Sequence, residues 1–182
     1  MKEPEALPTN GFTLAELLVI VALVAVLAAI ILPNVLRSQI SANEASAVGS
    51  IASINRAEVS YQTANPTIGF ASSLESLGPI GKDSECHVPS PAHACLIEAA
   101  LAQAGAARQA RSGYWFRVSP GERNAQGAVS AYVAGAAAAE YKQTGVRDFC
   151  SEEDGVIRFR DPGGSSRPAA NSAECAAMSI LQ

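Results

Sequence analysis

The sequence has little net charge, few histidines and few large aromatic side chains. Its 13 Lys and Arg residues against 17 Asp and Glu leave a net charge of −4, which excludes the strong positive field typical of nucleic-acid-binding proteins. Both histidines lie in one short segment, and the sequence contains no P-loop, no G-x-S-x-G motif and no dinucleotide-binding fingerprint. We therefore predict no enzyme, no cofactor and no nucleic-acid partner.

Large apolar residues are concentrated in one segment near the N-terminus. Ala supplies 35 of the 182 positions, so much of the apolar content has little area to bury. Residues 17–32, in contrast, read LLVIVALVAVLAAIIL without a polar side chain. With its flanking residues the apolar segment covers Phe12–Leu32, and such a helix is about 30 Å long, the thickness of a bilayer core. A single segment of this kind excludes a multi-pass transporter.

A secretory signal peptide is the alternative interpretation of this segment. A signal peptide has a shorter apolar region, of about 7–15 residues, followed by a small-residue cleavage site. Here the chain continues as PNVLRSQ after Leu32, and the preceding MKEPEALPTNG is poorly basic. We therefore predict a retained transmembrane helix over Phe12–Leu32. Lys2 before it and Arg37 after it are a weak indication of orientation.

Residues 11–18 read GFTLAELL, and this segment resembles the prepilin cleavage and methylation motif of type IV pilins and type II secretion pseudopilins. The resemblance rests on Gly11, Phe12 and Glu16, followed by the apolar run and Pro33. It implies that residues 1–11 are a leader, less basic than is usual in the family. It also implies that a prepilin peptidase cuts between Gly11 and Phe12 and methylates the new amine of Phe12.

Glu16 has two interpretations. An ionisable side chain in a membrane span is costly and is usually functional, and the resemblance implies an assembly role for Glu16, paired with the Phe12 amine of a neighbouring subunit. The local alternative is a capping box, Thr13-x-x-Glu16, which satisfies free N–H groups at a helix start. Pro33 lacks an N–H, so we expect a kink near it or simply the end of the span.

An amphipathic pattern follows the membrane segment. Apolar residues recur at steps of 7, 4, 3 and 7 to form one stripe: Ile40, Ala47, Ile51, Ile54 and Tyr61. This spacing predicts a helical continuation over residues 33–64, stopped by Asn65-Pro66 and packed by its stripe on a globular domain over residues 65–182. Other faces of this helix carry Arg37, Glu44, Asn55 and Arg56. A surface helix on an unrelated domain would give the same pattern.

The periodicity changes beyond residue 112. Aromatic and β-branched residues predict strands over 113–119, 129–133 with a continuation into the following Ala run, 145–149 and 156–159. The turn at Asp154-Gly155 joins the last two, in a hairpin that loosely resembles the final hairpin of pseudopilin-like domains. A helical turn over 73–77, an Ala-rich helix-forming segment over 93–111 and a loop-like tail over 161–182 complete the expected elements. The predicted fold class is α+β, a long N-terminal helix packed on a small antiparallel sheet of three or four strands, as in pilins.

The four cysteines predict two disulfides on the outer side of the membrane. Three pairings are possible. We favour Cys86–Cys95, which closes a short loop, and Cys150–Cys175, which pins the tail to the sheet.

Two segments contain metal-ligand residue types. Cys86-His87 and His93-x-Cys95 offer zinc ligands, but adjacent Cys and His suit one tetrahedron poorly. Residues 152–154 (Glu-Glu-Asp) offer oxygen atoms to Ca²⁺, but the EF-hand spacing is absent and a solvated acidic turn is the better interpretation. We predict no metal site.

Together these features favour a structural subunit of a type IV pilus-like filament. The resemblance implies a single-pass precursor in the inner membrane with a periplasmic globular domain, an inner-membrane assembly platform, and identical or related subunits as partners in a helical filament at the cell surface. The alternative within the family is a pseudopilin of a type II secretion system, in a periplasmic pseudopilus. The alternative of another class is a membrane-anchored periplasmic binding domain that never polymerises.

Overall fold

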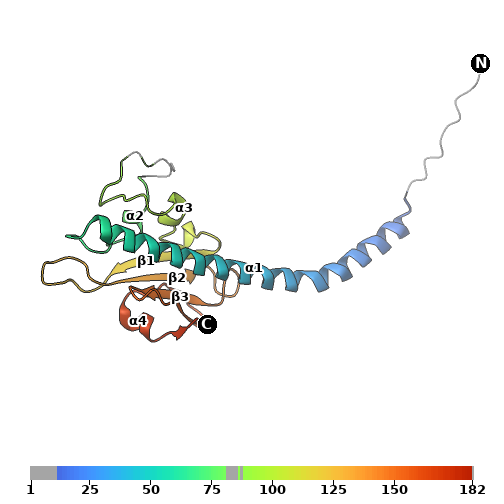
Figure 1. Ribbon diagram of the computed structural model, residues 1–182. Coiled ribbons are helices and arrows are strands. Elements are labelled where there is room, and N and C mark those ends of the chain that lie inside the picture. Colours follow the sequence, from blue (N-terminus) through green and yellow to red (C-terminus); the bar gives the residue numbers. More distant parts are fainter. Residues whose placement is uncertain (1–11, 81–85, 87, 182) are drawn as a thin grey trace, which may run out of the picture. The chain divides into compact units, whose positions relative to one another are not determined.

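The computed structural model describes residues 12–80, 86 and 88–181 (Figure 1). The chain divides into two units, Met1–Ser38 and Gln39–Gln182, and each is described by itself. The leader predicted over residues 1–11, which includes Gly11, lies outside the described residues, as does His87 of the zinc alternative.

The longest element is the helix α1, Leu14–Ala64, which supplies residues to both units. It is long and apolar enough to cross a membrane. In the first unit the large apolar side chains that the structure describes are exposed, among them Leu14 at 77% and Val26 at 62%. Pro33 lies inside α1, so the helix does not end there, and the kink expected near it stays a prediction.

The helix α1 ends at the stop signal that the sequence contains. The backbone N–H of Asn65 and its side-chain amide both donate to the carbonyl of Tyr61, at 2.9 and 3.0 Å. Pro66 follows and has no N–H with which to continue the helix. The last turn of α1 is thus closed by Asn65, whose side-chain amide gives the Tyr61 carbonyl a second donor.

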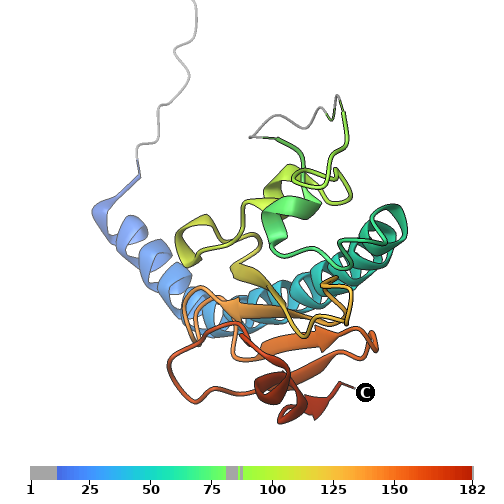
Figure 2. The same ribbon diagram turned by 90° about the vertical axis from the view of Figure 1, so that its left-hand side faces the viewer.

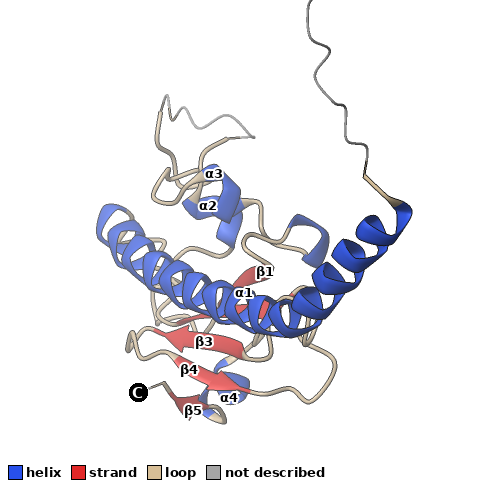
Figure 3. Ribbon diagram, turned by 90° about the vertical axis from the view of Figure 1, so that its right-hand side faces the viewer, coloured by secondary structure: helices blue, strands red, loops and turns tan. Residues whose placement is uncertain are grey.

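A five-stranded antiparallel sheet forms the centre of the second unit, with its strands in chain order. The strands are β1 (Tyr114–Pro120), β2 (Tyr132–Ala138), β3 (Asp148–Glu152), β4 (Arg158–Arg160) and β5 (Ser179–Ile180). Within this unit, α1 runs along the sheet, and α4 (Ser172–Ala176) lies against β2 and β3 (Figures 1 and 3). The short helices α2 (Leu74–Leu77) and α3 (Ala99–Ala102) lie beside α1 (Figure 2). The predicted α+β class is confirmed.

The strand β2 is buried along its whole length because both of its faces are covered. Tyr132, Ala134 and Ala136 join the main core, which also contains the predicted stripe of α1. Val133 joins a second cluster on the other face, with members from β3, the tail and α4: Cys150, Ala169, Cys175 and Met178. Of the predicted stripe, Ala47, Ile51, Ile54 and Tyr61 are at most 3% exposed and Ile40 is half-buried. The packing of the stripe on the domain is therefore confirmed.

Small side chains in β2 allow the tail to approach the sheet closely. A Cβ atom on Gly135 would lie 2.7 Å from the backbone nitrogen of Ala169 and 2.9 Å from its oxygen. Neither backbone atom can move without displacing the tail. Ala and Gly residues in β2 bury little apolar area, but their small size lets other parts of the chain pack closely on both faces of this strand.

The Ala-rich segment over 93–111 is mostly not helical, contrary to its helix propensity. Only α3 and the single 3₁₀ turn η1 (Ala107–Gln109) form there. The start of the segment is held instead by tertiary bonds, since the N–H groups of Ala94 and Leu96 donate to carbonyls of Ser76 and Leu77 at 2.8 and 2.7 Å. Propensity is a weak determinant, and these contacts override it.

The tail over 161–182 is not loop throughout, so that prediction was wrong. It contains α4 and β5, which adds a fifth strand to the sheet. Asn171 caps α4 by accepting the N–H of Glu174 at 2.9 Å. The strand predicted over 145–149 lies about three residues further along the chain, as β3. Its pairing with β2 extends to Glu152, which lies opposite Val133.

Candidate assembly segment and helix-docking site

The N-terminal end of α1 is closed by Thr13 and Glu16. The Glu16 carboxylate accepts the backbone N–H of Thr13 at 2.9 Å and its hydroxyl at 2.7 Å. The Thr13 hydroxyl oxygen accepts the N–H of Glu16 at 3.2 Å. This is the reciprocal pattern of a capping box. The capping interpretation of Glu16 is therefore realised in the single chain, and its assembly role stays a prediction.

The segment on both sides of Glu16 has an exposed apolar surface. Phe12 is 77% exposed, and Leu18, Leu23 and Leu27 are each more than half exposed. The most apolar window of this helix is not buried against any described part of the chain. A contiguous apolar surface of this size requires lipid or protein from outside the chain to cover it. The chemistry of this segment is therefore insertion and association.

In the second unit, Glu44 docks α1 onto the loop between β2 and β3. One carboxylate oxygen accepts the N–H groups of Val146 and Arg147, at 3.0 and 3.1 Å. The other accepts Nε and Nη2 of Arg147, at 2.8 and 2.6 Å. The Arg147 guanidinium also lies 5.5 and 5.4 Å from the rings of Phe149 and Phe159. Four donors compensate the buried carboxylate, two on each oxygen, and these contacts hold α1 against the β2–β3 loop.

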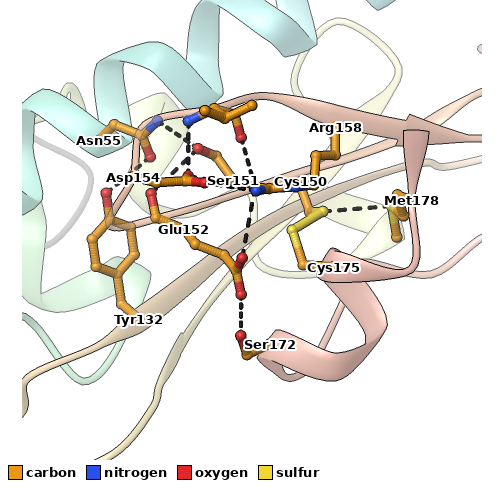
Figure 4. Close-up of polar contacts among 11 residues, drawn as sticks. Asn55, Tyr132, Cys150, Ser151, Glu152, Asp154, Arg158, Ser172, Cys175 and Met178 are labelled. Atoms are coloured by element: carbon orange, nitrogen blue, oxygen red, sulfur yellow. Dashed lines mark hydrogen bonds and ion pairs between the residues drawn. A yellow bond between two sulfur atoms is a disulfide. The ribbon is translucent and has the colours of Figure 1, made fainter. Parts of the chain in front are cut away.

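A second polar contact connects α1 to the middle of the sheet (Figure 4). The Asn55 amide donates to the Ser151 hydroxyl on β3 at 2.9 Å, and its oxygen accepts the Tyr132 hydroxyl of β2 at 3.1 Å. Burial raises the pKa of Tyr132 well above its ordinary value, with smaller contributions from nearby carboxylates. Tyr132 therefore remains a neutral donor, and one amide joins the helix to two neighbouring strands.

Two carboxylates of the acidic turn considered for Ca²⁺ pair with Arg158. The guanidinium lies 2.6 Å from Asp154 and 3.6 Å from Glu152 (Figure 4). Asp154 also accepts the N–H of Val156 at 2.9 Å. The hydrogen bond from Arg158 is the main reason that the pKa of Asp154 is lowered. Arg158 and the Val156 N–H thus engage Asp154 in closing the turn. Among residues 12–80, 86 and 88–181, no group of three or more His, Cys, Asp or Glu residues could hold a metal ion.

The cysteines are paired as Cys86–Cys95 and Cys150–Cys175, with Cα atoms 6.0 and 5.8 Å apart. The second pair joins β3 to α4 and lies beside Met178 (Figure 4). A cysteine in a disulfide has no thiolate to bind zinc. With Cys86 and Cys95 joined, the zinc alternative therefore loses both of its sulfur ligands. The pairing stays a prediction for the native protein, and its test is given below.

Sequence reasoning placed Glu44 and Asn55 on faces away from the stripe, and it did not single out Glu58 or Arg147. A usable signal was present. Glu44 and Glu58 lie seven residues before and after Ile51, so both share its side of the helix. An acidic residue in register with an apolar stripe indicates a buried carboxyl, but its partner on a distant loop is set by tertiary structure.

Residues 8–32 match the family model described as the prokaryotic N-terminal methylation motif. This motif is the signature of type IV pilins and pseudopilins, which are structural subunits. It supports a type IV pilin-like or pseudopilin subunit. The match covers the end of the predicted leader and the apolar segment and does not extend into the second unit. No curated protein and no solved structure gave a significant match.

Proposed function

We propose that the chain is a structural subunit of a type IV pilus-like filament. A prepilin peptidase would cut after Gly11 and methylate the amine of Phe12, and the apolar helices would then leave the lipid and pack together in the filament. The observation that carries this proposal is the methylation motif at residues 8–32, directly before a helix whose exposed apolar side chains need partners from outside the chain.

Glu16 has two successive roles in this proposal. In the precursor its carboxylate is held by Thr13, as the structure has it. In the filament it lies among apolar helices, where one local cap compensates a charge poorly. The amine of Phe12 on a neighbouring subunit would supply the opposite charge. Because each subunit offers one carboxylate and one amine, the contact repeats without closing, as a helical filament requires.

The compartment follows from the same proposal. The precursor would lie in the inner membrane with the second unit in the periplasm, where an oxidising environment allows both disulfides to form. An inner-membrane assembly platform and identical or related subunits would be its partners. The same motif also fits a pseudopilin of a type II secretion system. Neighbouring genes for an outer-membrane secretion channel would favour the pseudopilin, and genes for a retraction ATPase would favour the pilus.

Glu16→Gln tests the assembly role, with Thr13→Val as its matched control. Glutamine keeps a capping side chain but removes the charge, whereas Thr13→Val removes the capping hydroxyl and keeps the charge. The two measurements, made in the native cell, are the yield of sheared filaments and the ratio of processed to unprocessed chain. We expect Glu16→Gln to lower filament yield strongly while processing continues, and Thr13→Val to have the smaller effect.

The opposite order would contradict the assembly role. Normal filaments with Glu16→Gln would show that the charge is not needed, and a larger loss with Thr13→Val would show that the cap is the function of this pair. A chain that stays unprocessed and monomeric in the native cell would support the membrane-anchored binding domain instead.

A further inference from the structure

One carboxyl in the second unit has almost no polar partner. Glu58 lies on α1 between Ile54 and Tyr61 and is 0% exposed. Its Oε2 accepts the backbone N–H of Ala71 at 2.8 Å, and its Oε1 has no hydrogen-bond partner. Among the described residues no Lys or Arg forms an ion pair with it. Glu44 on the same helix, by comparison, accepts four hydrogen bonds.

The groups around Glu58 do not compensate a charge on it. Tyr61, on the same helix, donates its hydroxyl to the carbonyl of Pro91 at 2.7 Å. Tyr132, on β2, donates its hydroxyl to Asn55 at 3.1 Å. The segment after α1 contributes the Ala71 N–H, and the nearby acidic residue of α2, Glu75, is exposed. Both phenol protons are thus committed elsewhere, and one amide is a weak compensation for a buried anion.

Glu58 is therefore neutral in the folded chain at neutral pH. Burial raises the pKa of its carboxyl to about 8, opposed by the smaller effect of the Ala71 N–H. Burial of Tyr61 itself raises the pKa of its hydroxyl, with a smaller contribution from the charge that Glu58 carries when ionised. An uncharged carboxyl needs far less solvation than an anion, so the proton is what makes this packing possible.

The contact with Ala71 holds a joint between the end of α1 and the β1–β2 connection. Next to Ala71, the N–H of Phe70 donates to the carbonyl of Val129 at 3.0 Å, and the Phe70 ring lies 4.8 Å from the Tyr132 ring. A Cβ atom on Gly69, whose φ is +85°, would lie 2.0 Å from the Val129 oxygen. The segment is therefore packed closely on the β1–β2 connection, and because Glu58 is 0% exposed, water reaches its carboxyl only if the packing around it loosens.

We propose that the Glu58 carboxyl is a proton-dependent latch between α1 and the segment from Asn65 to Ala71, closed when the carboxyl is neutral and opened by its ionisation. Ionisation draws water to Oε1, which has no hydrogen-bond partner, and the packing of the segment from Asn65 to Ala71 against α1 loosens to admit that water, while the Ala71 N–H can stay bonded to Oε2. The latch lies within the second unit and does not depend on filament assembly.

The sign of the pH effect follows from the two states of the chain. In the unfolded chain Glu58 titrates near 4.5, and in the folded chain near 8. Below 4.5 both states are protonated and the full stability is present. Between these values only the unfolded state loses the proton, so the unfolding constant rises about tenfold per pH unit and levels off above pH 8.

The test compares the wild-type chain with Glu58→Gln and the control Glu75→Gln, all full-length in detergent. Urea unfolding from pH 5 to 9 gives the unfolding constant of each. We expect it to rise about four-hundredfold more between pH 5 and 8 in wild type than in Glu58→Gln, and equally in wild type and Glu75→Gln. Parallel profiles for wild type and Glu58→Gln would overturn the proposal.

Hydrogen exchange on the wild-type chain tests the latch without any substitution. After correction for intrinsic rates, exchange of the segment from Asn65 to Ala71 should accelerate between pH 7 and 9, while β2 and β3 stay protected. Uniform acceleration over the domain, or none in this segment, would contradict a local latch even if Glu58→Gln fails to fold.

Discussion

The two parts of α1 have the same secondary structure but opposite surroundings. Up to Ser38 the large apolar side chains that the structure describes are exposed, and the acidic residue Glu16 is held by Thr13 at the start of the helix. From Gln39 onward its stripe is buried, and Glu44 is held by a loop more than a hundred residues away. Helix formation is local in both parts. The partners differ, because the second part finds them within the chain and the first part needs lipid or other chains.

Truncating one apolar side chain in each part of α1 should give the largest difference in the free energy of unfolding. Ile51 is 0% exposed and Leu23 is 62% exposed. We expect Ile51→Ala to lower the free energy of unfolding of the domain by about 4 kcal/mol, because it leaves a cavity in the core. Leu23→Ala should leave it unchanged. Urea unfolding of the full-length variants in detergent measures both, and equal effects would show that the first part also belongs to the folded core.

Removing the Cys150–Cys175 disulfide should lower the free energy of unfolding of the domain on which the second part of α1 packs. The bridge closes a loop with a sequence separation of 25, and its loss as a double Ser variant should cost about 3–4 kcal/mol. The Cys86–Cys95 bridge is the control. Its sequence separation is only 9, so replacing both of its cysteines with Ser should cost less, about 2–3 kcal/mol.

Peptide mapping without reduction checks the pairing itself. It should recover both linked pairs and no free thiol from protein taken from its native compartment. Four alkylatable thiols would refute the disulfides and revive the metal alternative.

Removing the docking cation should have a smaller effect. Arg147→Ala leaves the buried Glu44 carboxylate with only two backbone donors. Because Arg147 is partly exposed, we expect a loss of about 2–3 kcal/mol in unfolding free energy. The control is Arg56→Ala, since Arg56 is an exposed arginine of α1 that donates to Ser53 and should cost less than about 0.5 kcal/mol. Equal losses would show that the Glu44 contact does not position the helix.

The sequence contained enough to predict the long helix, its buried stripe, its stop at Asn65-Pro66 and the antiparallel sheet, because periodicity and stop residues act locally. It did not reveal that Glu44 and Arg147 pair, because the two residues are more than a hundred positions apart and only the tertiary structure brings them together. The prediction of a helix-forming segment over 93–111 was mostly wrong for the same reason, since tertiary hydrogen bonds override helix propensity there. The cap of α4 at Asn171 was a local signal that was readable but missed.

The most direct test of the account is the N-terminus of the protein isolated from its native membrane or filaments. Intact-mass analysis with N-terminal peptide sequencing should find a chain that begins at Phe12 and carries one added methyl group on its amine. Gly11 replaced by a bulky residue should abolish this product and leave the precursor in the membrane. A native chain that begins at Met1, with residues 1–11 retained, would contradict processing and with it the assignment as a pilin-like subunit.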